Sequence, residues 1–468
     1  MLCDTGRVSA HRALGLWLVI FGAYAATLWI DAAPGERYAG AEPRYLLLAE
    51  SVVSDGDVDL RDEYRDRSYR SFHRAGLPPG GRPIKGRLRE PLAVGLPLAI
   101  APAYALGGPR LTELELAALA ALAFVLAASL ARRLVPEPWA SGAPLVCALS
   151  PPALGHATAV SPEAPAAALI AGAAVLALRS RETRRARTAI ATGLLVAVLP
   201  WLGIEYLVAG AVILLAQWRW LAHRGRGFHG LLAGEALFAS LVVFVTVNGQ
   251  LYEGLTPYAA GLPGHEPDAI AGRDLLDRVP RLLSLWIDRS DGLLRWGPVL
   301  ALAFFAVWLL WRSRRDRVAR ALPERADAEV AAGLLVAVAG AQTIVAAFAA
   351  PAISGPWFPG RHLVAALPAG AGLAAWGLRH APRVGTVLCA LTLIAGGWLC
   401  AALCLDGGSW SLPPSWIPWG PLDRLFPDFG AGGAYPSVVG AALLAALAAL
   451  ALHERRRARR IGALALKP

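Results

Sequence analysis

Charged residues are scarce in this chain of 468 residues. They make up 17% of it, against about 25% in an average soluble domain, while hydrophobic residues reach 56% and the mean hydropathy is +0.48. A soluble fold of this size has too little interior to bury so much apolar surface. The composition therefore excludes a disordered chain and an ordinary soluble enzyme, and it predicts a protein that contacts lipid.

Cysteine is also rare, with five residues in the whole chain. Four of them fall inside long apolar runs, and Cys3 lies in the N-terminal tail. This distribution matches neither a disulfide framework nor a set of metal ligands. We therefore expect free thiols.

Long apolar runs, in contrast, are abundant. A helix that crosses a bilayer needs about 20 predominantly apolar residues. The runs predict an all-α polytopic membrane protein with about twelve transmembrane helices, near residues 13–30, 112–131, 141–158, 163–178, 188–203, 206–221, 230–249, 293–311, 329–350, 362–378, 384–404 and 435–452. A further run, 91–106, is rich in proline, and we expect it to lie at the outer interface without crossing.

The positions of Lys and Arg orient these spans. If the N-terminus is cytoplasmic, 26 of the 45 basic residues face the cytoplasm, including the block 179–187. Cytoplasmic loops of membrane proteins carry such an excess. The net charge of +11 is thus a topology signal and not a nucleic-acid-binding patch. It predicts a multi-pass plasma-membrane protein whose two termini are both cytoplasmic.

The predicted spans contain almost no charge away from their ends. A proton- or ion-coupled transporter would be expected to carry acidic residues or histidine near mid-membrane. Neither an inverted repeat nor a glycine-rich phosphate loop is present in the sequence. The polar residues gather instead in the predicted outer loops, above all in residues 31–90, which contain eleven acids.

Glu42 is the most suggestive of these acids. The stretch Leu46–Val53 is apolar on one helical face, which predicts a helix that starts at Pro43 and lies on the membrane. Glu42 then stands at the N-terminus of that helix, just above the lipid. A carboxylate there can act as a general base or can simply cap the helix, and the residues alone leave both readings open.

The segment Asp55-Gly-Asp57-Val-Asp59 resembles the start of an EF-hand calcium loop. Its glycine is misplaced, however, and the twelfth residue is Asp66 where the motif has Glu. A calcium site and a solvated turn both remain open, and we assign no metal ligands.

Several short motifs follow one another in a defined order. Together they resemble the GT-C superfamily of integral-membrane glycosyltransferases, within it the branch of aminoarabinose transferases and protein O-mannosyltransferases. The motifs are Ala41-Glu42-Pro43-Arg44-Tyr45, Arg89-Glu90-Pro91, Arg132-Arg133-Leu134, Ser150-Pro151, Ser161-Pro162-Glu163, Trp286 to Pro298 and Gly360-Arg361-His362. The resemblance implies a GT-C-like transmembrane module over 1–311, with outer loops 31–111 and 250–292 and outer-face juxtamembrane helices. Residues 312–468 would then form C-terminal transmembrane helices and a basic cytoplasmic tail.

The resemblance also implies a reaction. A sugar would pass, with inversion, from a polyprenyl-phosphate donor to a glycan, lipid or protein of the cell envelope at the outer face of the plasma membrane. The acceptor hydroxyl needs a carboxylate base, and the leaving phosphate needs a cation. We expect Glu42 to be the base and Glu163 its partner, although the family's usual catalytic acid is replaced here by Ala41. The residues expected to bind substrate are Arg44, Tyr45, Arg89, Glu90, His156, Arg289, Arg361 and His362.

Each candidate also has a structural explanation. Glu90 and Glu163 can serve as helix-terminal residues, His156 as a buried hydrogen-bonding residue, and Arg361 as a headgroup anchor. Trp410, Trp416 and Trp419 can contact sugar or lie at the lipid interface. No cofactor is assigned, although a divalent metal remains open. The alternative function is a non-catalytic GT-C-like scaffold or a transporter or flippase of lipid-linked glycans.

Overall fold

A computed structural model describes most of the chain. The described residues are 4–183, 185–262, 275, 277–313, 323–350, 355–406, 408–411, 426–429, 438–443, 445, 446, 449 and 452. The last predicted span, 435–452, therefore lies only partly within the described residues.

The described chain is mostly helical, as its composition predicts. The longer helices are α1 (Asp4–Ala25), α2 (Glu42–Ser54), α4 (Gly95–Ala131), α5 (Trp139–Ala148), α7 (Glu163–Glu182), α8 (Ala186–Leu202), α9 (Leu207–Ala222), α10 (Gly227–Tyr252), α13 (Ala301–Ser313), α14 (Pro323–Phe348), α15 (Leu367–His380) and α16 (Pro382–Asp406). The short elements are α3 (Arg61–Asp66), η1 (Ser68–Ser71), α6 (Pro151–Ala157), η2 (Ile204–Tyr206), η3 (Pro257–Ala260), α11 (Arg281–Ile287), α12 (Leu293–Trp296), η4 (Pro298–Leu300), η6 (Arg361–Ala366) and the antiparallel strands β1 (Pro83–Ile84) and β2 (Arg87–Leu88).

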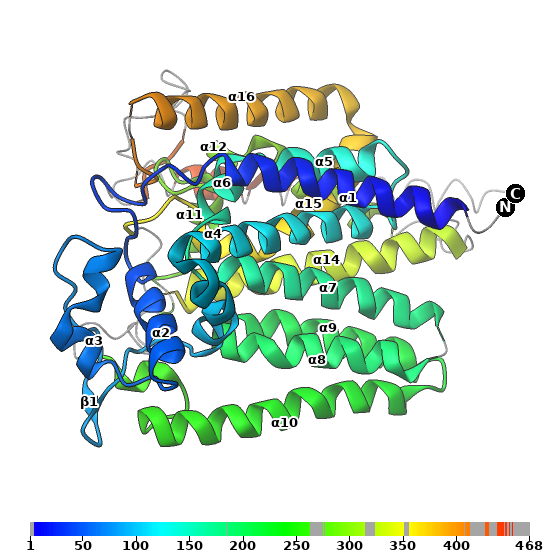
Figure 1. The fold of residues 1–468 in the computed structure, drawn as a ribbon. Coiled ribbons are helices and arrows are strands. Elements are labelled where there is room, and N and C mark those ends of the chain that lie inside the picture. The colour runs from blue at the N-terminus through cyan, green and yellow to red at the C-terminus, as the bar shows by residue number, and fades with distance from the viewer. Residues whose placement is uncertain are drawn as a thin grey trace, which may run out of the picture.

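The long helices run side by side and form a bundle with two different ends (Figure 1). At one end, called here the loop end, lie α2, α3, β1, α6, α11 and α12. At the other, called here the arginine end, short turns connect α4 to α5, α7 to α8 and α9 to α10. The last two connections contain Arg185 and Arg224. The polar chemistry and the basic turns are thus separated by the length of the helices.

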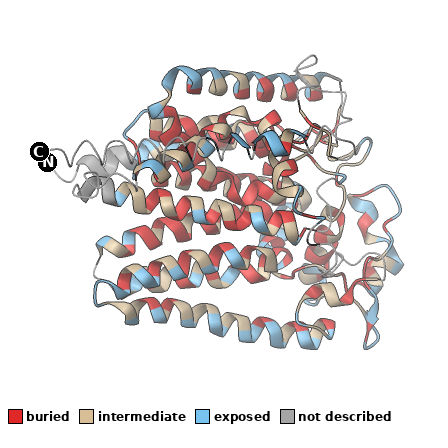
Figure 2. Ribbon diagram, turned by 180° about the vertical axis from the view of Figure 1, so that it is seen from behind, coloured by how far each residue is buried: buried red, intermediate tan, exposed pale blue. Residues whose placement is uncertain are grey.

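Buried residues concentrate in the middle of the bundle, and the outermost helices expose apolar side chains (Figure 2). Phe238 on α10 is 68% exposed, and Trp398 on α16 is 63% exposed. In contrast, the alanine-rich α7 is buried almost throughout, because small side chains let neighbouring helices approach closely. A bundle with an apolar outer surface suits lipid as its surroundings.

The predicted count of twelve spans is not confirmed. Among the described residues, six helices are long and apolar enough to cross a membrane: Gly95–Ala131, Glu163–Glu182, Ile204–Ala222, Gly227–Ala260, Asp327–Phe348 and Pro382–Leu405. Several predicted runs are broken, because proline cannot donate a backbone hydrogen bond within a helix. The run 141–158 splits at Pro151 into α5 and α6, and 293–311 splits at Pro298 into α12, η4 and α13. Apolar composition alone did not show these breaks.

The proline-rich run 91–106 becomes the first part of α4, which bends at Gly107 and Gly108. Gly108 adopts φ +62° and ψ −155°, a combination that is essentially restricted to glycine. The bend separates this first part from the longer part that follows, while the position of 91–106 at the outer interface stays a prediction. Glu113 lies five residues beyond Gly108, at the loop end of the longer part.

The predicted helix after Pro43 is confirmed as α2, but its apolar face does not lie bare on the lipid. Leu46, Leu47 and Leu48 are at most 1% exposed, because α2 packs against α4 and the outer loop. The residues between Asp55 and Leu92 fold over it and include the β1–β2 hairpin, which turns at Lys85 and Gly86.

Labelling with a membrane-impermeant maleimide tests the two ends of the bundle. In a chain that keeps Cys147 as its only native cysteine, Ser71→Cys at the loop end and Arg187→Cys at the arginine end are exposed positions. We expect the reagent to label them from opposite sides of sealed membranes, because the apolar helices separate them. Native Cys147, which is fully buried, should remain unlabelled from either side. Labelling of both positions from one side would contradict this arrangement.

Candidate functional site

A pocket opens at the loop end, between segments that are far apart in the sequence. The empty space in and above it, open solvent included, is about 560 Å³. Its walls come from the strap 30–42 between α1 and α2, from Glu113 on α4, from α6 and the turn that follows it, and from residues 356–361. Three residues that the sequence analysis proposed line this pocket: Glu42, His156 and Arg361.

Glu42 is held in the pocket by backbone donors. The N–H of Val160 donates to Oε1 at 2.8 Å, and the N–H of Ala39 donates to Oε2 at 2.8 Å. Burial raises the pKa of the Glu42 carboxyl to about 7, although both N–H groups and the positive charge of Arg361 act in the opposite direction. The carboxyl therefore exchanges its proton near neutral pH, where a general base is most effective.

Arg361 forms an ion pair with Glu163 behind the pocket wall. Arg361 Nε donates to Glu163 Oε1 at 2.5 Å, and the guanidinium also lies 4.7 Å from the centroid of the Trp357 ring. The side chain of Glu163 is 7% exposed and that of Arg361 is 18% exposed. The pair therefore fixes the Arg361 cation at the edge of the pocket. Glu163 itself does not line the pocket.

His156 and three aromatic rings shape the rest of the wall. His156 Nε2 donates to the carbonyl oxygen of Phe358 at 2.9 Å. The Phe358 ring packs edge-on against the rings of His156 and Trp410. Trp357, Phe358 and Trp410 all line the pocket, so one side of it is aromatic.

Three donors that line the pocket are buried without a hydrogen-bond partner among the described residues. They are Ser161 Oγ, Trp357 Nε1 and Trp410 Nε1. Buried polar atoms in folded proteins are nearly always paired, and each exception calls for an explanation. A polar ligand would reach these donors once their side chains turn toward the pocket, because the three atoms themselves have almost no accessible surface.

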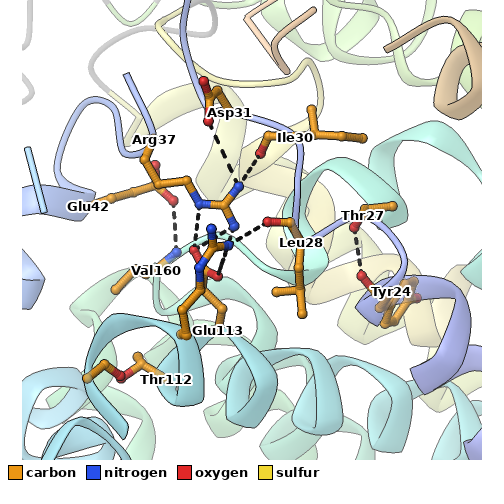
Figure 3. Close-up of polar contacts among 12 residues, drawn as sticks. Tyr24, Thr27, Leu28, Ile30, Asp31, Arg37, Glu42, Thr112, Glu113 and Val160 are labelled. Atoms are coloured by element: carbon orange, nitrogen blue, oxygen red, sulfur yellow. Dashed lines mark hydrogen bonds and ion pairs between the residues drawn. The ribbon is translucent and has the colours of Figure 1, made fainter. Parts of the chain in front are cut away.

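A buried carboxylate at Glu113 supports the strap. Figure 3 shows Arg37 reaching down onto Glu113, with Nη2 at 2.9 Å from both carboxylate oxygens. Arg37 Nη1 also donates to the carbonyl oxygen of Ile30 at 2.9 Å. Arg110 Nη1 adds a contact to Glu113 Oε2 at 3.3 Å and donates to the carbonyl of Leu28 at 2.7 Å. These contacts tie the strap to α4.

The sequence analysis missed Arg37 and Glu113, although both line the pocket. Glu113 is the second residue of the predicted span 112–131, and its side chain is 2% exposed. A charge inside an apolar segment is costly and commonly functional. The charge of Glu113 inside an apolar run was visible in the sequence. It was not singled out, because Glu113 lies at the end of the run, where charged residues are ordinary.

Arg44 and Glu90 lie together, away from the pocket. Arg44 Nε is 3.4 Å from Glu90 Oε2, and Glu90 also accepts hydrogen bonds from the Tyr64 hydroxyl at 2.5 Å and the Gly80 N–H at 2.9 Å. Glu90 is fully buried. The structure therefore places both residues in a cluster that closes the outer loop over α2.

The other candidates also lie outside the pocket lining. Tyr45 is buried in α2, where burial and then the negative charge of Glu163 raise its pKa. Arg89 is 6% exposed. The N–H of Arg289 donates to the carbonyl of Pro427 at 2.9 Å, and the His362 ring lies edge-on to Trp357 with the centroids 6.2 Å apart. The structure brings Glu42, Glu163, His156 and Arg361 together, with Tyr45 close behind them.

This arrangement combines a carboxyl that titrates near neutral pH, a fixed cation, unpartnered donors and an aromatic wall in one pocket. Such a site can bind an anionic or polyhydroxylated ligand and take a proton from it. No known family model matches the chain, and no curated protein matches its sequence.

The variant Glu113→Gln tests whether the buried ion pair holds the strap. Removing one partner of a buried pair leaves the other charge uncompensated, which costs about 3–5 kcal/mol. We expect Glu113→Gln to lower the free energy of unfolding in detergent by about that amount. Glu115→Gln, two residues along the same helix, is the matched control, because Glu115 Oε2 has no hydrogen-bond partner among the described residues. Equal stability of the two variants would contradict the role of the pair.

Proposed function

We propose that this protein is a membrane glycosyltransferase that takes a sugar from a polyprenyl-phosphate donor at the outer face of the plasma membrane. The observation that carries the proposal is the pocket in which Glu42 and Arg361 line the same walls as three buried, unpartnered donors. The pocket lies at the loop end of an apolar bundle. A donor with a lipid tail and a polar head would need a site of this kind, because its tail must stay in the membrane.

Glu42 is proposed as the base that activates the acceptor hydroxyl. An ionised carboxylate offers about four lone-pair positions, and the two backbone N–H groups occupy one on each oxygen. The remaining positions can receive the proton of a hydroxyl group that points into the pocket. The two backbone bonds keep the carboxylate in place during that transfer.

Arg361 is proposed to stabilise the phosphate that leaves. Its Nε–H is engaged by Glu163, and a guanidinium carries further N–H donors in the same plane. Glu163 fixes the direction of that plane. A preorganised cation in a site shielded from water stabilises developing negative charge strongly.

The aromatic wall is proposed to bind the sugar. Trp357 and Trp410 offer ring faces as well as unpartnered Nε1 donors, and Ser161 offers a hydroxyl. Rings can pack against the apolar face of a sugar, while the donors bind its hydroxyl oxygens. The acceptor class, a glycan, lipid or protein of the cell envelope, remains part of the proposal.

The proposed transfer is a single displacement at the anomeric carbon of the donor sugar. The acceptor hydroxyl gives its proton to Glu42 while its oxygen bonds to the anomeric carbon. The bond from that carbon to the phosphate oxygen breaks, and its electron pair leaves with the polyprenyl phosphate beside Arg361. Attack from the face opposite the phosphate inverts the anomeric centre.

The variant Glu42→Gln tests the role of the base. We expect at least a 100-fold loss of the transfer rate, because general-base catalysis contributes about 10²–10⁴-fold. The assay measures transfer of radiolabelled sugar from a panel of polyprenyl-phosphate hexoses and pentoses, with native membranes supplying the acceptor.

The matched control is Glu50→Gln, because Glu50 is on the same helix and its carboxylate accepts a hydrogen bond from the Tyr104 hydroxyl at 3.4 Å, outside the pocket. Glu50→Gln should retain wild-type transfer. Equal rates for Glu42→Gln and wild type would remove Glu42 from the reaction. Absence of transfer by the wild-type protein with the whole panel would favour a non-catalytic carrier of lipid-linked glycans.

The pH dependence provides a second test. The base acts in its ionised form, so activity should be low below the pKa of Glu42, rise through pH of about 7 and level off above it. The rate of transfer, measured between pH 5 and pH 9 at about constant ionic strength, should follow a single ionisation on this limb. A rate that falls as the pH rises through 7 would contradict ionised Glu42 as the base.

A further inference from the structure

Three acids meet where α2 ends and α3 begins. Asp55 follows the last residue of α2, and Asp62 and Glu63 lie in the first turn of α3. One carboxylate oxygen from each residue lies within 4.8 Å of the other two. The cluster is outside the pocket, and the proposed transfer reaction does not use it.

Glu63 distinguishes this cluster from an ordinary acidic surface. The residue is only 4% exposed, and neither of its carboxylate oxygens has a hydrogen-bond partner among the described residues. A buried carboxylate without a partner is strongly unfavourable, and two further acids beside it add repulsion. The fold therefore holds a group that lacks its counter-charge.

The neighbouring acids, in contrast, are satisfied by the protein itself. Asp57 Oδ1 accepts the N–H of Asp59 at 2.9 Å, and Asp59 Oδ1 accepts the N–H of Leu88 at 2.8 Å. Asp59 is also paired with Arg61 at 3.0 Å. Asp57 and Asp59 of the EF-hand-like segment are thus bonded to the backbone. Asp55, the remaining acid of that segment, lies beside Asp62 and Glu63.

We propose that Asp55, Asp62 and Glu63 bind a Ca²⁺ ion on the outer loop. Calcium prefers oxygen ligands at about 2.3–2.6 Å, so two ligands on opposite sides of the ion are about 4.6–5.2 Å apart. Three oxygens within 4.8 Å of one another can therefore surround one ion without a change in the backbone. The cluster contains no histidine or cysteine, which are the ligands that zinc prefers.

Calcium suits the site better than magnesium. Magnesium requires a near-ideal octahedron and retains its water, whereas calcium accepts irregular sets of six to eight oxygens. One buried, one partly exposed and one exposed carboxylate form an irregular set whose remaining positions water would fill. Extracellular calcium modules bind with dissociation constants of about 10⁻⁴–10⁻³ M, and we expect a value in that range.

The ion would join the C-terminal end of α2 to α3. The N-terminal end of α2 carries Glu42, so the ion would stabilise the outer loop around the helix on which the pocket depends. Binding is a property of these three acids alone, and it does not depend on the proposed transferase activity.

Calorimetry and thermal unfolding of the purified full chain in detergent test this site. After removal of metal with a chelator, we expect CaCl₂ to bind wild type at one site per chain and to raise its melting temperature, because a ligand that binds only the folded state stabilises it. Glu63→Gln should weaken binding at least tenfold and remove the shift in melting temperature. Asp62→Asn provides a second variant with the same expected effect.

Asp66→Asn is the matched control. Asp66 is on the same helix and pairs with Arg65 at 2.9 Å, outside the cluster, so this variant should bind Ca²⁺ as wild type does. Absence of calcium binding by wild type would overturn the proposal, as would equal binding by wild type and Glu63→Gln. MgCl₂ is titrated in parallel, and binding of Mg²⁺ as tight as that of Ca²⁺ would overturn the assignment of calcium.

Discussion

The ion pair between Glu163 and Arg361 joins the two halves of the chain at the point where the pocket forms. The partners are 198 residues apart in sequence, one at the first residue of α7 and the other at the first residue of η6. Neither charge could remain buried alone without a large cost in free energy. The pair therefore requires 355–361 to lie against α6 and α7, which brings Trp357, Phe358 and Arg361 to face Glu42. Without that contact, the pocket would lose one of its walls.

Two further buried carboxylates organise the loop end through pairs of the same kind. Glu113 ties the strap between α1 and α2 to α4 through Arg37, and Glu90 closes the outer loop through Arg44, Tyr64 and Gly80. The loop end is therefore organised by a few paired charges above an apolar bundle. These pairs matter more here than on a soluble surface, because buried pairs are screened less by salt. They also explain why acids that resemble catalytic residues in the sequence can have structural roles.

The sequence predicted the helical class and the helix after Pro43, because apolar runs and proline act through local backbone physics. It also proposed Glu42, Glu163, His156 and Arg361, which the structure brings together. It did not separate them from Arg44, Arg89 and Glu90, which differ only in their long-range partners. The predicted count of twelve spans was not confirmed for a similar reason. Apolar composition does not reveal that the helices are interrupted at Pro151 and Pro298. Pairing across 76 residues, as between Arg37 and Glu113, leaves no local pattern to read.

Ala41 occupies the position at which the GT-C resemblance expects the family's catalytic acid. The surroundings of Ala41 and Glu42 decide whether the pocket still contains a group that can act as a base. Successive residues of an α-helix point about 100° apart, so neighbours at the start of α2 face different surroundings. Ala41 packs against the hydrophobic core, whereas Glu42 lines the pocket and receives the N–H groups of Ala39 and Val160. An acid at position 41 would therefore have to displace apolar contacts before it reached the pocket. The carboxylate one residue later already lies there, so the alanine does not leave this pocket without a group that can accept a proton.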